Sequence, residues 1–120
     1  MKVLIVDDNP INLKFMYYSL RGDYDIEMAE NGYDALKMTE ANKYDMIILD
    51  LWMPDIDGAE LVRQIRSLKS NVNNQTPVMF CTTSSADQDK DRCYSFGADE
   101  YLIKPIEVKL LKEKMEQYLG

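Results

Sequence analysis

Histidine is absent from this chain of 120 residues, and cysteine occurs only twice. Without histidine, the chain cannot build a serine–histidine triad or a histidine-ligated zinc site, and it cannot itself carry a phosphohistidine. The two cysteines, Cys81 and Cys93, lack the close CxxC spacing of a metal or redox site. We therefore interpret them as reduced packing residues.

Long apolar runs and basic clusters are also missing. No apolar run approaches the ~20 residues of a membrane-spanning helix, and the one after Met1 is too short for a signal-peptide core. The net charge of −7 disfavours contact with nucleic acid phosphates. We expect a soluble, cytoplasmic protein that binds neither membranes nor nucleic acids directly. Its length predicts one domain over 1–120, and Met1 just before the first apolar run favours a natural start.

Five short apolar runs predict five β-strands. The first, third and fourth runs are continuously apolar, which is typical of strands covered on both faces. The second run alternates apolar and polar residues, so it is expected nearer the edge of the sheet. The predicted strands span residues 3–6, 24–29, 46–49, 78–81 and 101–103.

A helical pattern follows each predicted strand, at residues 10–20, 33–41, 59–69, 86–96 and 108–119. Five strand–helix repeats favour a parallel sheet with helices on both faces. The helix at 86–96 is the most polar, and the segment 70–76 is interpreted as a solvated connector. Asn9 is predicted to cap the first helix. The face that this helix buries is expected to carry Ile11, Phe15, Met16 and Leu20.

Polar side chains stand at the ends of four of these five strands. Because the carboxyl ends of parallel strands meet at one edge, these side chains are expected to share a pocket. Three carboxylates cannot lie close together fully ionised without a cation, and an oxygen cluster suits Mg²⁺. A lysine and two hydroxyls then suit an anionic guest such as a phosphoryl group. The residues are Asp7, Asp8, Asp50, Thr82, Thr83 and Lys104.

With these residues at the ends of its predicted strands, the chain resembles the response-regulator receiver domains of two-component signalling, including the chemotaxis receivers. The resemblance rests on four motifs and covers nearly the whole chain. It implies a three-layer flavodoxin-like (βα)5 fold, with a five-stranded parallel sheet of order 2-1-3-4-5. The motifs are LIVDDNP at 4–10, ILDLWMPDIDG at 48–58, PVMFCTT at 77–83 and GADEYLIKP at 97–105.

The resemblance assigns a metal site and a nucleophile. Asp50 resembles the phosphoacceptor, which attacks the phosphorus of a phosphohistidine on a partner kinase. Asp8 resembles the direct Mg²⁺ ligand, and Asp7 the acid that orients metal-bound water. Asp50 and the backbone carbonyl of Trp52 fall at the other metal-binding positions. An ionised aspartate is a known nucleophile for phosphoryl groups, which agrees with this assignment.

The resemblance also assigns the phosphoryl-binding and switch residues. Lys104 resembles the lysine that pairs with the phosphoryl group, and the backbone N–H of Thr83 would help to hold that group. Thr82 resembles the catalytic and switch hydroxyl, and Tyr101 the aromatic that turns inward when Thr82 moves. Pro105 stands where the family usually has a cis peptide bond. The family more often has a smaller residue at Thr83 and an aromatic one at position 106, which is isoleucine in this chain.

We therefore predict a phosphorylation-dependent switch that shifts the 86–119 face to bind a downstream protein. It would catalyse its own phosphorylation and dephosphorylation without being a turnover enzyme. Its donor would be a sensor histidine kinase or histidine phosphotransfer protein docking near the helix at 10–20, and it would be a monomer or weak dimer. A phosphohydrolase is one alternative, but such enzymes need a second acid where this chain has Trp52. An interaction module without phosphate chemistry is another.

The output of the switch stays open at this point. A stand-alone receiver, a phosphorelay shuttle and a domain of a larger regulator or hybrid kinase all fit the sequence.

Overall fold

The computed structural model describes all 120 residues as five strands that alternate with five helices. Each element begins and ends within two residues of its predicted range. The strands are β1 (Lys2–Val6), β2 (Asp25–Ala29), β3 (Met46–Leu49), β4 (Val78–Thr82) and β5 (Glu100–Ile103). The helices are α1 (Pro10–Leu20), α2 (Gly32–Ala41), α3 (Gly58–Ser67), α4 (Asp87–Ser95) and α5 (Val108–Leu119).

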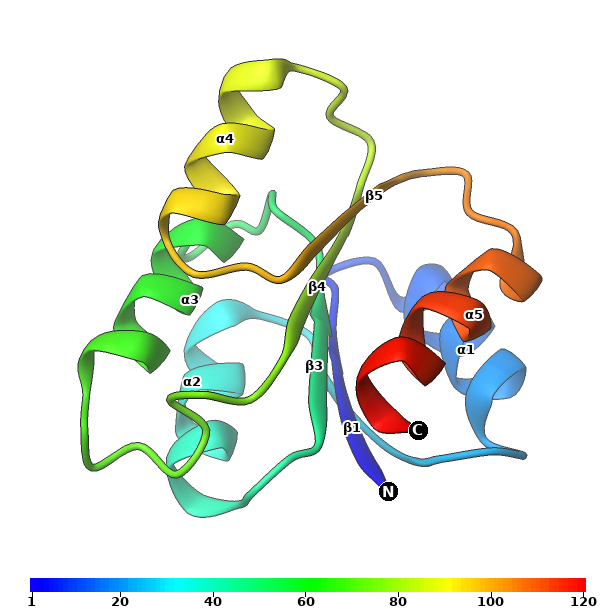
Figure 1. The fold of residues 1–120 in the computed structure, drawn as a ribbon, viewed down its shortest axis with the longest axis horizontal. Coiled ribbons are helices and arrows are strands. Elements are labelled where there is room, and N and C mark those ends of the chain that lie inside the picture. Colours follow the sequence, from blue (N-terminus) through cyan, green and yellow to red (C-terminus); the bar gives the residue numbers. More distant parts are fainter.

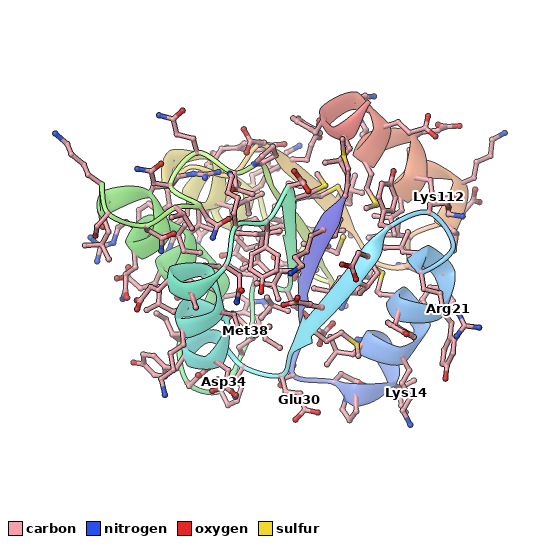
Figure 2. The ribbon with its side chains drawn as sticks, turned by 90° about the horizontal axis from the view of Figure 1, so that it is seen from below. Lys14, Arg21, Glu30, Asp34, Met38 and Lys112 are labelled. Atoms are coloured by element: carbon pink, nitrogen blue, oxygen red, sulfur yellow. The ribbon has the colours of Figure 1, made fainter.

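The strands form a single parallel sheet in the order β2-β1-β3-β4-β5. Helices α1 and α5 cover one face, and α2, α3 and α4 cover the other (Figure 1). The predicted three-layer flavodoxin-like fold is therefore confirmed. Seen from below, with the edge strand β2 in front, α1 lies on one side of the strand and α2 on the other (Figure 2).

The central strands supply the core on both faces. Every residue of β3 is buried, and successive side chains alternate between the two faces because the side-chain period of a strand is two. Leu4 and Ile47 pack beneath α2 and α3, whereas Val3 and Ile48 pack beneath α1 and α5. This double coverage explains why residues 3–6, 46–49 and 78–81 are continuously apolar.

Helix α1 buries only part of the face that was predicted, with Leu20 buried and Met16 partly buried. Asn9 caps it as expected, and its side chain accepts a hydrogen bond from the amide of Ile11 at 2.9 Å. The helix buries Leu13 and Leu20, but Ile11 and Phe15 are 76% and 56% exposed. The prediction was wrong for Ile11 and Phe15. Helix α1 carries apolar residues on more than one side, so the spacing of these residues does not define a single buried face.

The segment 70–76 is not the solvated connector that its polar composition suggested. Asn73 is fully buried, and its side-chain amide donates to the carbonyls of Thr39 and Asn42, both at 2.6 Å. Its side-chain oxygen accepts from the amide of Tyr44 at 2.8 Å and from the hydroxyl of Thr76 at 3.0 Å. One side chain therefore ties the end of α2 to the start of β3 and to the strand that follows, β4.

Replacing this asparagine should destabilise the fold. Asn73→Ala leaves buried carbonyls and an amide without partners, so we expect the free energy of unfolding to fall by about 2–4 kcal/mol. The neighbouring change Asn74→Ala is the control. The side-chain amide of Asn74 makes only one hydrogen bond, a 3.4 Å surface contact to the carbonyl of Lys69. It should cost about 0.5 kcal/mol or less. Urea unfolding measures both, and equal losses would contradict the structural role of Asn73.

Candidate functional site

Two of the predicted carboxylates leave adjacent strands at the same level. Val6 of β1 pairs with Leu49 of β3, so the next residues, Asp7 and Asp50, emerge side by side. The amide of Asp50 donates to the carbonyl of Val6 at 3.0 Å. Asp8 completes the group, and one carboxylate oxygen from each aspartate lies within 4.8 Å of the others. The structure thus brings together the three predicted acids.

Lys104 reaches this cluster from β5. Ile103 pairs with Thr82, and the amide of Lys104 donates to the carbonyl of Thr82 at 2.7 Å. The ammonium group then donates to Asp7 Oδ2 at 2.9 Å and to Asp50 Oδ2 at 3.2 Å. Burial lowers the pKa of Lys104, but the hydrogen bond to Asp7 and the charge of Asp50 outweigh it, and the pKa is raised overall. Lys104 therefore remains a cation at the centre of the site.

The other oxygens of these two carboxylates face backbone amides. Asp7 Oδ1 accepts from the amide of Asn9 at 2.9 Å, and Asp50 Oδ1 accepts from the amide of Trp52 at 3.3 Å. Asp7 is only 6% exposed, whereas Asp8 is exposed and pairs with no basic side chain. The cluster thus has three carboxylates and one lysine, and the lysine contacts only Asp7 and Asp50. This surplus of negative charge and its oxygen donors fit a hard divalent cation.

The two predicted switch residues meet at the loop after β4. Thr82 is buried, and its Oγ1 accepts from the amide of Ser84 at 3.4 Å. Tyr101 is also buried, and its hydroxyl donates to the carbonyl of Ser84 at 2.9 Å. Burial raises the pKa of Tyr101, so its hydroxyl stays a donor. The Tyr101 ring is therefore held against the loop after β4 by this hydrogen bond. Thr83, in contrast, is exposed.

An apolar cavity of about 490 Å³ adjoins the carboxylates and Lys104. It lies between α1 and the start of α5, and Ile11 and Phe15 form part of its wall together with Ile106. The sequence interpretation missed this role for Ile11 and Phe15. The available signal was the number of apolar residues in α1, which exceeds what one buried face requires.

Two smaller expectations are also confirmed. The Lys104-Pro105 peptide bond is cis. Cys81, which lines the cavity, is buried, and burial raises the pKa of its thiol to about 12. Cys93 is buried too, and burial raises its pKa to about 11. Both thiols are free and protonated at neutral pH, in agreement with their interpretation as packing residues.

Sequence comparison identifies the family to which this site belongs. Residues 3–116 match the response regulator receiver domain. The chain belongs to this receiver-domain family. Receiver domains are signalling domains of two-component systems that are phosphorylated by histidine kinases, rather than turnover enzymes.

Proteins that contain a similar receiver domain differ in how much of their length this domain takes up. Response regulator ArlR of Staphylococcus saprophyticus is 34% identical over 119 residues, which cover 98% of this chain and 52% of that protein. Sensor histidine kinase RcsC of Salmonella typhimurium is also 34% identical over 119 residues, which cover 98% of this chain but 12% of the kinase. This receiver domain therefore spans about half, or far less, of the length of these curated relatives.

A solved structure resembles the receiver domain closely. The receiver domain of sensor histidine kinase PA1611 from Pseudomonas aeruginosa has a TM-score of 0.89 at 28% identity. The match covers 99% of this chain and 97% of that one. That structure has a magnesium ion coordinated in its active site cleft.

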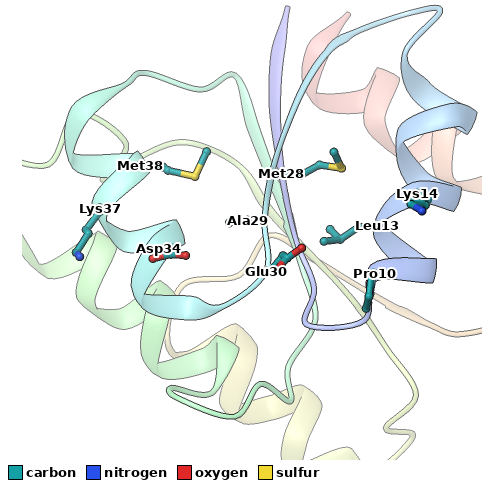
Figure 3. A pocket seen from close by; sticks show the side chains of 9 residues that line it. All are labelled: Pro10, Leu13, Lys14, Met28, Ala29, Glu30, Asp34, Lys37 and Met38. Atoms are coloured by element: carbon teal, nitrogen blue, oxygen red, sulfur yellow. The ribbon is translucent and has the colours of Figure 1, made fainter.

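A larger hollow of about 590 Å³ lies elsewhere, across the edge strand β2 (Figure 3). Side chains from α1 and α2 border it on either side of the strand, and none of the clustered acids lines it. Its charged side chains come from α1, from α2 and from the residue that follows β2. We therefore place the chemistry of the receiver domain at the smaller cavity. The lining residues are Pro10, Leu13, Lys14, Met28, Ala29, Glu30, Asp34, Lys37 and Met38.

Removing the central cation should destabilise the metal-free receiver domain. Lys104→Met leaves Asp7 buried beside Asp50 with no compensating charge, so we expect a loss of about 2–3 kcal/mol in unfolding free energy. Lys112→Met is the matched control, because the pair of Lys112 with Asp23 is largely exposed and is worth about 1 kcal/mol or less. Urea unfolding in a chelator buffer measures both. A Lys104 effect as small as that of Lys112 would refute the pairing.

Proposed function

We propose that Asp50 accepts a phosphoryl group from a phosphohistidine on a partner protein. A carboxylate oxygen of Asp50 attacks phosphorus, the phosphorus–nitrogen bond breaks, and the imidazole leaves. The observation that carries the proposal is the ammonium group of Lys104 shared between Asp7 and Asp50 at the strand ends. Its positive charge lies beside the attacking carboxylate, where it can pair with the oxygens of an incoming phosphoryl group.

The acidic cluster is proposed to hold Mg²⁺. Asp8, Asp50 and the backbone carbonyl of Trp52 would bind the ion, and Asp7 would orient metal-bound water. When bound, Mg²⁺ screens the charge on the transferring phosphoryl oxygens. The chemistry of the donors supports this proposal, because carboxylate and carbonyl oxygens are the ligands that Mg²⁺ prefers. A related receiver structure with magnesium in its cleft supports it further.

The remaining site residues would bind the phosphoryl group. Lys104 would pair with one phosphoryl oxygen as a point charge. The hydroxyl of Thr82 and the backbone N–H of Thr83 would hold the others. The amide of Lys104 donates a hydrogen bond to the carbonyl of Thr82 at 2.7 Å. This bond between the ends of β5 and β4 fixes the two residues relative to each other.

The receiver domain is proposed to catalyse only its own phosphorylation and dephosphorylation. A phosphohydrolase of the aspartate type needs a second acid two residues after its nucleophile, and Trp52 occupies that position. The half-exposed Trp52 offers no side-chain proton donor or acceptor comparable to a carboxyl group. The geometry therefore favours a switch.

Two exposed apolar surfaces are proposed to bind partners. Ile11, Phe15 and Tyr18 are exposed along α1 beside the cavity, where a sensor histidine kinase or histidine phosphotransfer protein would dock. Tyr94 and Ile103 are exposed on the 86–119 face, which would bind the downstream protein after phosphorylation. Large exposed apolar patches are typical of interaction sites.

We further propose that residues 1–120 form one receiver domain, that it acts in the cytoplasm, and that it is a monomer or weak dimer. Its helices are too short and too polar for any of them to span a bilayer. Direct binding of nucleic acid is not expected at a net charge of −7.

Phosphorylation at Asp50 is the direct test. With Mg²⁺ and an acyl phosphate donor, intact mass should show one added phosphoryl group on the parent protein. Asp50→Ala should abolish it, because the nucleophile is gone. Asp91→Ala, a change at an exposed acid on α4, should label like the parent. Labelling of Asp50→Ala, or a parent that never forms the adduct, would overturn the proposed function.

Metal binding gives an independent test. Mg²⁺ should raise the melting temperature of the parent, with a stabilisation of about 2.7 kcal/mol at 100 times its dissociation constant. Asp8→Asn should lose most of this effect, since it removes a direct ligand, whereas Asp91→Asn should keep it. In chelator, Asp8→Asn should be at least as stable as the parent, because it removes a repelling charge. Equal Mg²⁺ shifts in both variants would contradict the assigned site.

A further inference from the structure

Asp55 lies in the loop between β3 and α3, yet its carboxylate binds the first turn of another helix. Its Oδ1 accepts from the amide of Gly32 at 3.1 Å, and its Oδ2 accepts from the amide of Tyr33 at 2.9 Å. These are the first two residues of α2, and the first amides of a helix have no acceptor within it. The loop that follows the nucleophile therefore caps α2.

The contact between this loop and α2 is both polar and close. Burial raises the pKa of Asp55, but hydrogen bonds from the amides of Tyr33 and Gly32 outweigh it, and the pKa is lowered overall. Asp55 is thus a charged acceptor, whose hydrogen bonds are stronger than those of a neutral group. The next residue, Ile56, is buried against Gly32, where an added Cβ atom would lie 2.1 Å from Ile56 Cγ2.

The same loop carries two of the groups proposed to bind metal, the carboxylate of Asp50 and the backbone carbonyl of Trp52. Its ends are held by core packing, because Leu51 and Ile56 are buried. The residues between them, 52–55, form an arc that is mostly exposed. Within this arc, Asp55 is the residue whose side chain bonds to another element of the fold. The position of the arc therefore depends on Asp55.

We propose that Asp55 is a positioning residue for the metal site. By anchoring the arc 52–55 to the start of α2, it holds the carbonyl of Trp52 where it can serve with the clustered acids. The inference rests on the proposed function. Asp55 itself is not a member of the acidic cluster. Without the anchor the arc would sample other conformations, and the apparent affinity for Mg²⁺ falls in proportion to the population of the competent one.

A titration with MgCl₂ tests this role. Trp52 is the only tryptophan and lies in the arc itself, so its fluorescence reports on the loop. The dissociation constant of Mg²⁺ should be about three- to tenfold higher in Asp55→Ala than in the parent. Melting temperatures measured with and without Mg²⁺ should show the same loss, since a ligand of the folded state stabilises it.

Asn31→Ala is the matched control. Asn31 caps the same helix, since its Oδ1 accepts from the amide of Asp34 at 2.8 Å, but it lies outside the loop. Both Asn31→Ala and Asp55→Ala should lower the melting temperature in chelator, because each removes a cap of α2. Only Asp55→Ala should weaken Mg²⁺ binding, and Asn31→Ala should change the dissociation constant by less than about twofold.

Gly32→Ala disturbs the contact from the other side. Its added Cβ atom would displace Ile56 and with it the loop, while every charge and every proposed ligand stays in place. This variant should also raise the dissociation constant of Mg²⁺. In the double variant Asp55→Ala/Gly32→Ala the increase should be smaller than the product of the two single increases, because both changes break one contact.

Salt separates positioning from simple charge. The attraction between the charge of Asp55 and Mg²⁺ is screened as KCl is raised, since the Debye length falls from about 10 Å at 0.1 M to about 3 Å at 1 M. The ratio of the dissociation constants of Asp55→Ala and the parent should stay the same over this range if Asp55 positions the loop. A ratio that falls toward one would overturn the role of Asp55.

The remaining outcomes are equally distinct. Parent-like Mg²⁺ affinity in Asp55→Ala, or an equal loss in Asn31→Ala, would overturn the inference. If Asp55→Ala does not fold, Gly32→Ala decides, and parent-like affinity in that variant would contradict the anchor. A parent protein with no saturable response to Mg²⁺ would instead overturn the metal site of the proposed function.

Discussion

The site depends on like charges that the parallel sheet forces together. Asp7 and Asp50 follow paired residues of neighbouring strands, so neither can move away without breaking the register of β1 and β3. Lys104 compensates part of this charge from a third strand, through contacts at 2.9 and 3.2 Å. The fold tolerates the repulsion because the strands that carry it are buried on both faces. The apolar core thus keeps these carboxylates together, although their mutual repulsion would separate them if the strands did not fix their positions.

The helices differ in how firmly they are attached to this rigid sheet. Helix α3 buries five of its ten residues, including Leu61 and Ile65, so its position is determined by core packing. Helix α4 buries only Cys93, and its side-chain contacts with neighbouring loops are polar. A change of charge at the strand ends can alter polar contacts far more readily than it can repack a core. The same sheet can therefore carry one static helix and one responsive helix.

The sequence predicted the strands and the acids well for a physical reason. A buried strand in a parallel sheet is a continuous apolar run, and the residue after it is marked by a sudden change to a polar type, as at Asp50 and Lys104. The buried side of α1 could not be predicted, since Ile11 and Leu13 are equally apolar. Asn73 was misinterpreted because a buried asparagine and a solvated one look alike in sequence until their partners are known.

The arrangement of the layers determines how such a domain could use two partners. Helix α1 lies in one layer with α5, whereas α4 lies in the opposite layer (Figure 1). In the proposed function, a donor on α1 and a target near α4 would therefore occupy separate surfaces. The state of Asp50 would then have to cross the sheet, and the structure offers a short route at its rim from Thr82 to Ser84 and Tyr101. Since these contacts are single hydrogen bonds, each worth only about 1 kcal/mol, the two states would differ little in free energy. A phosphoryl group with its charge near −2 is large enough to reverse such a balance.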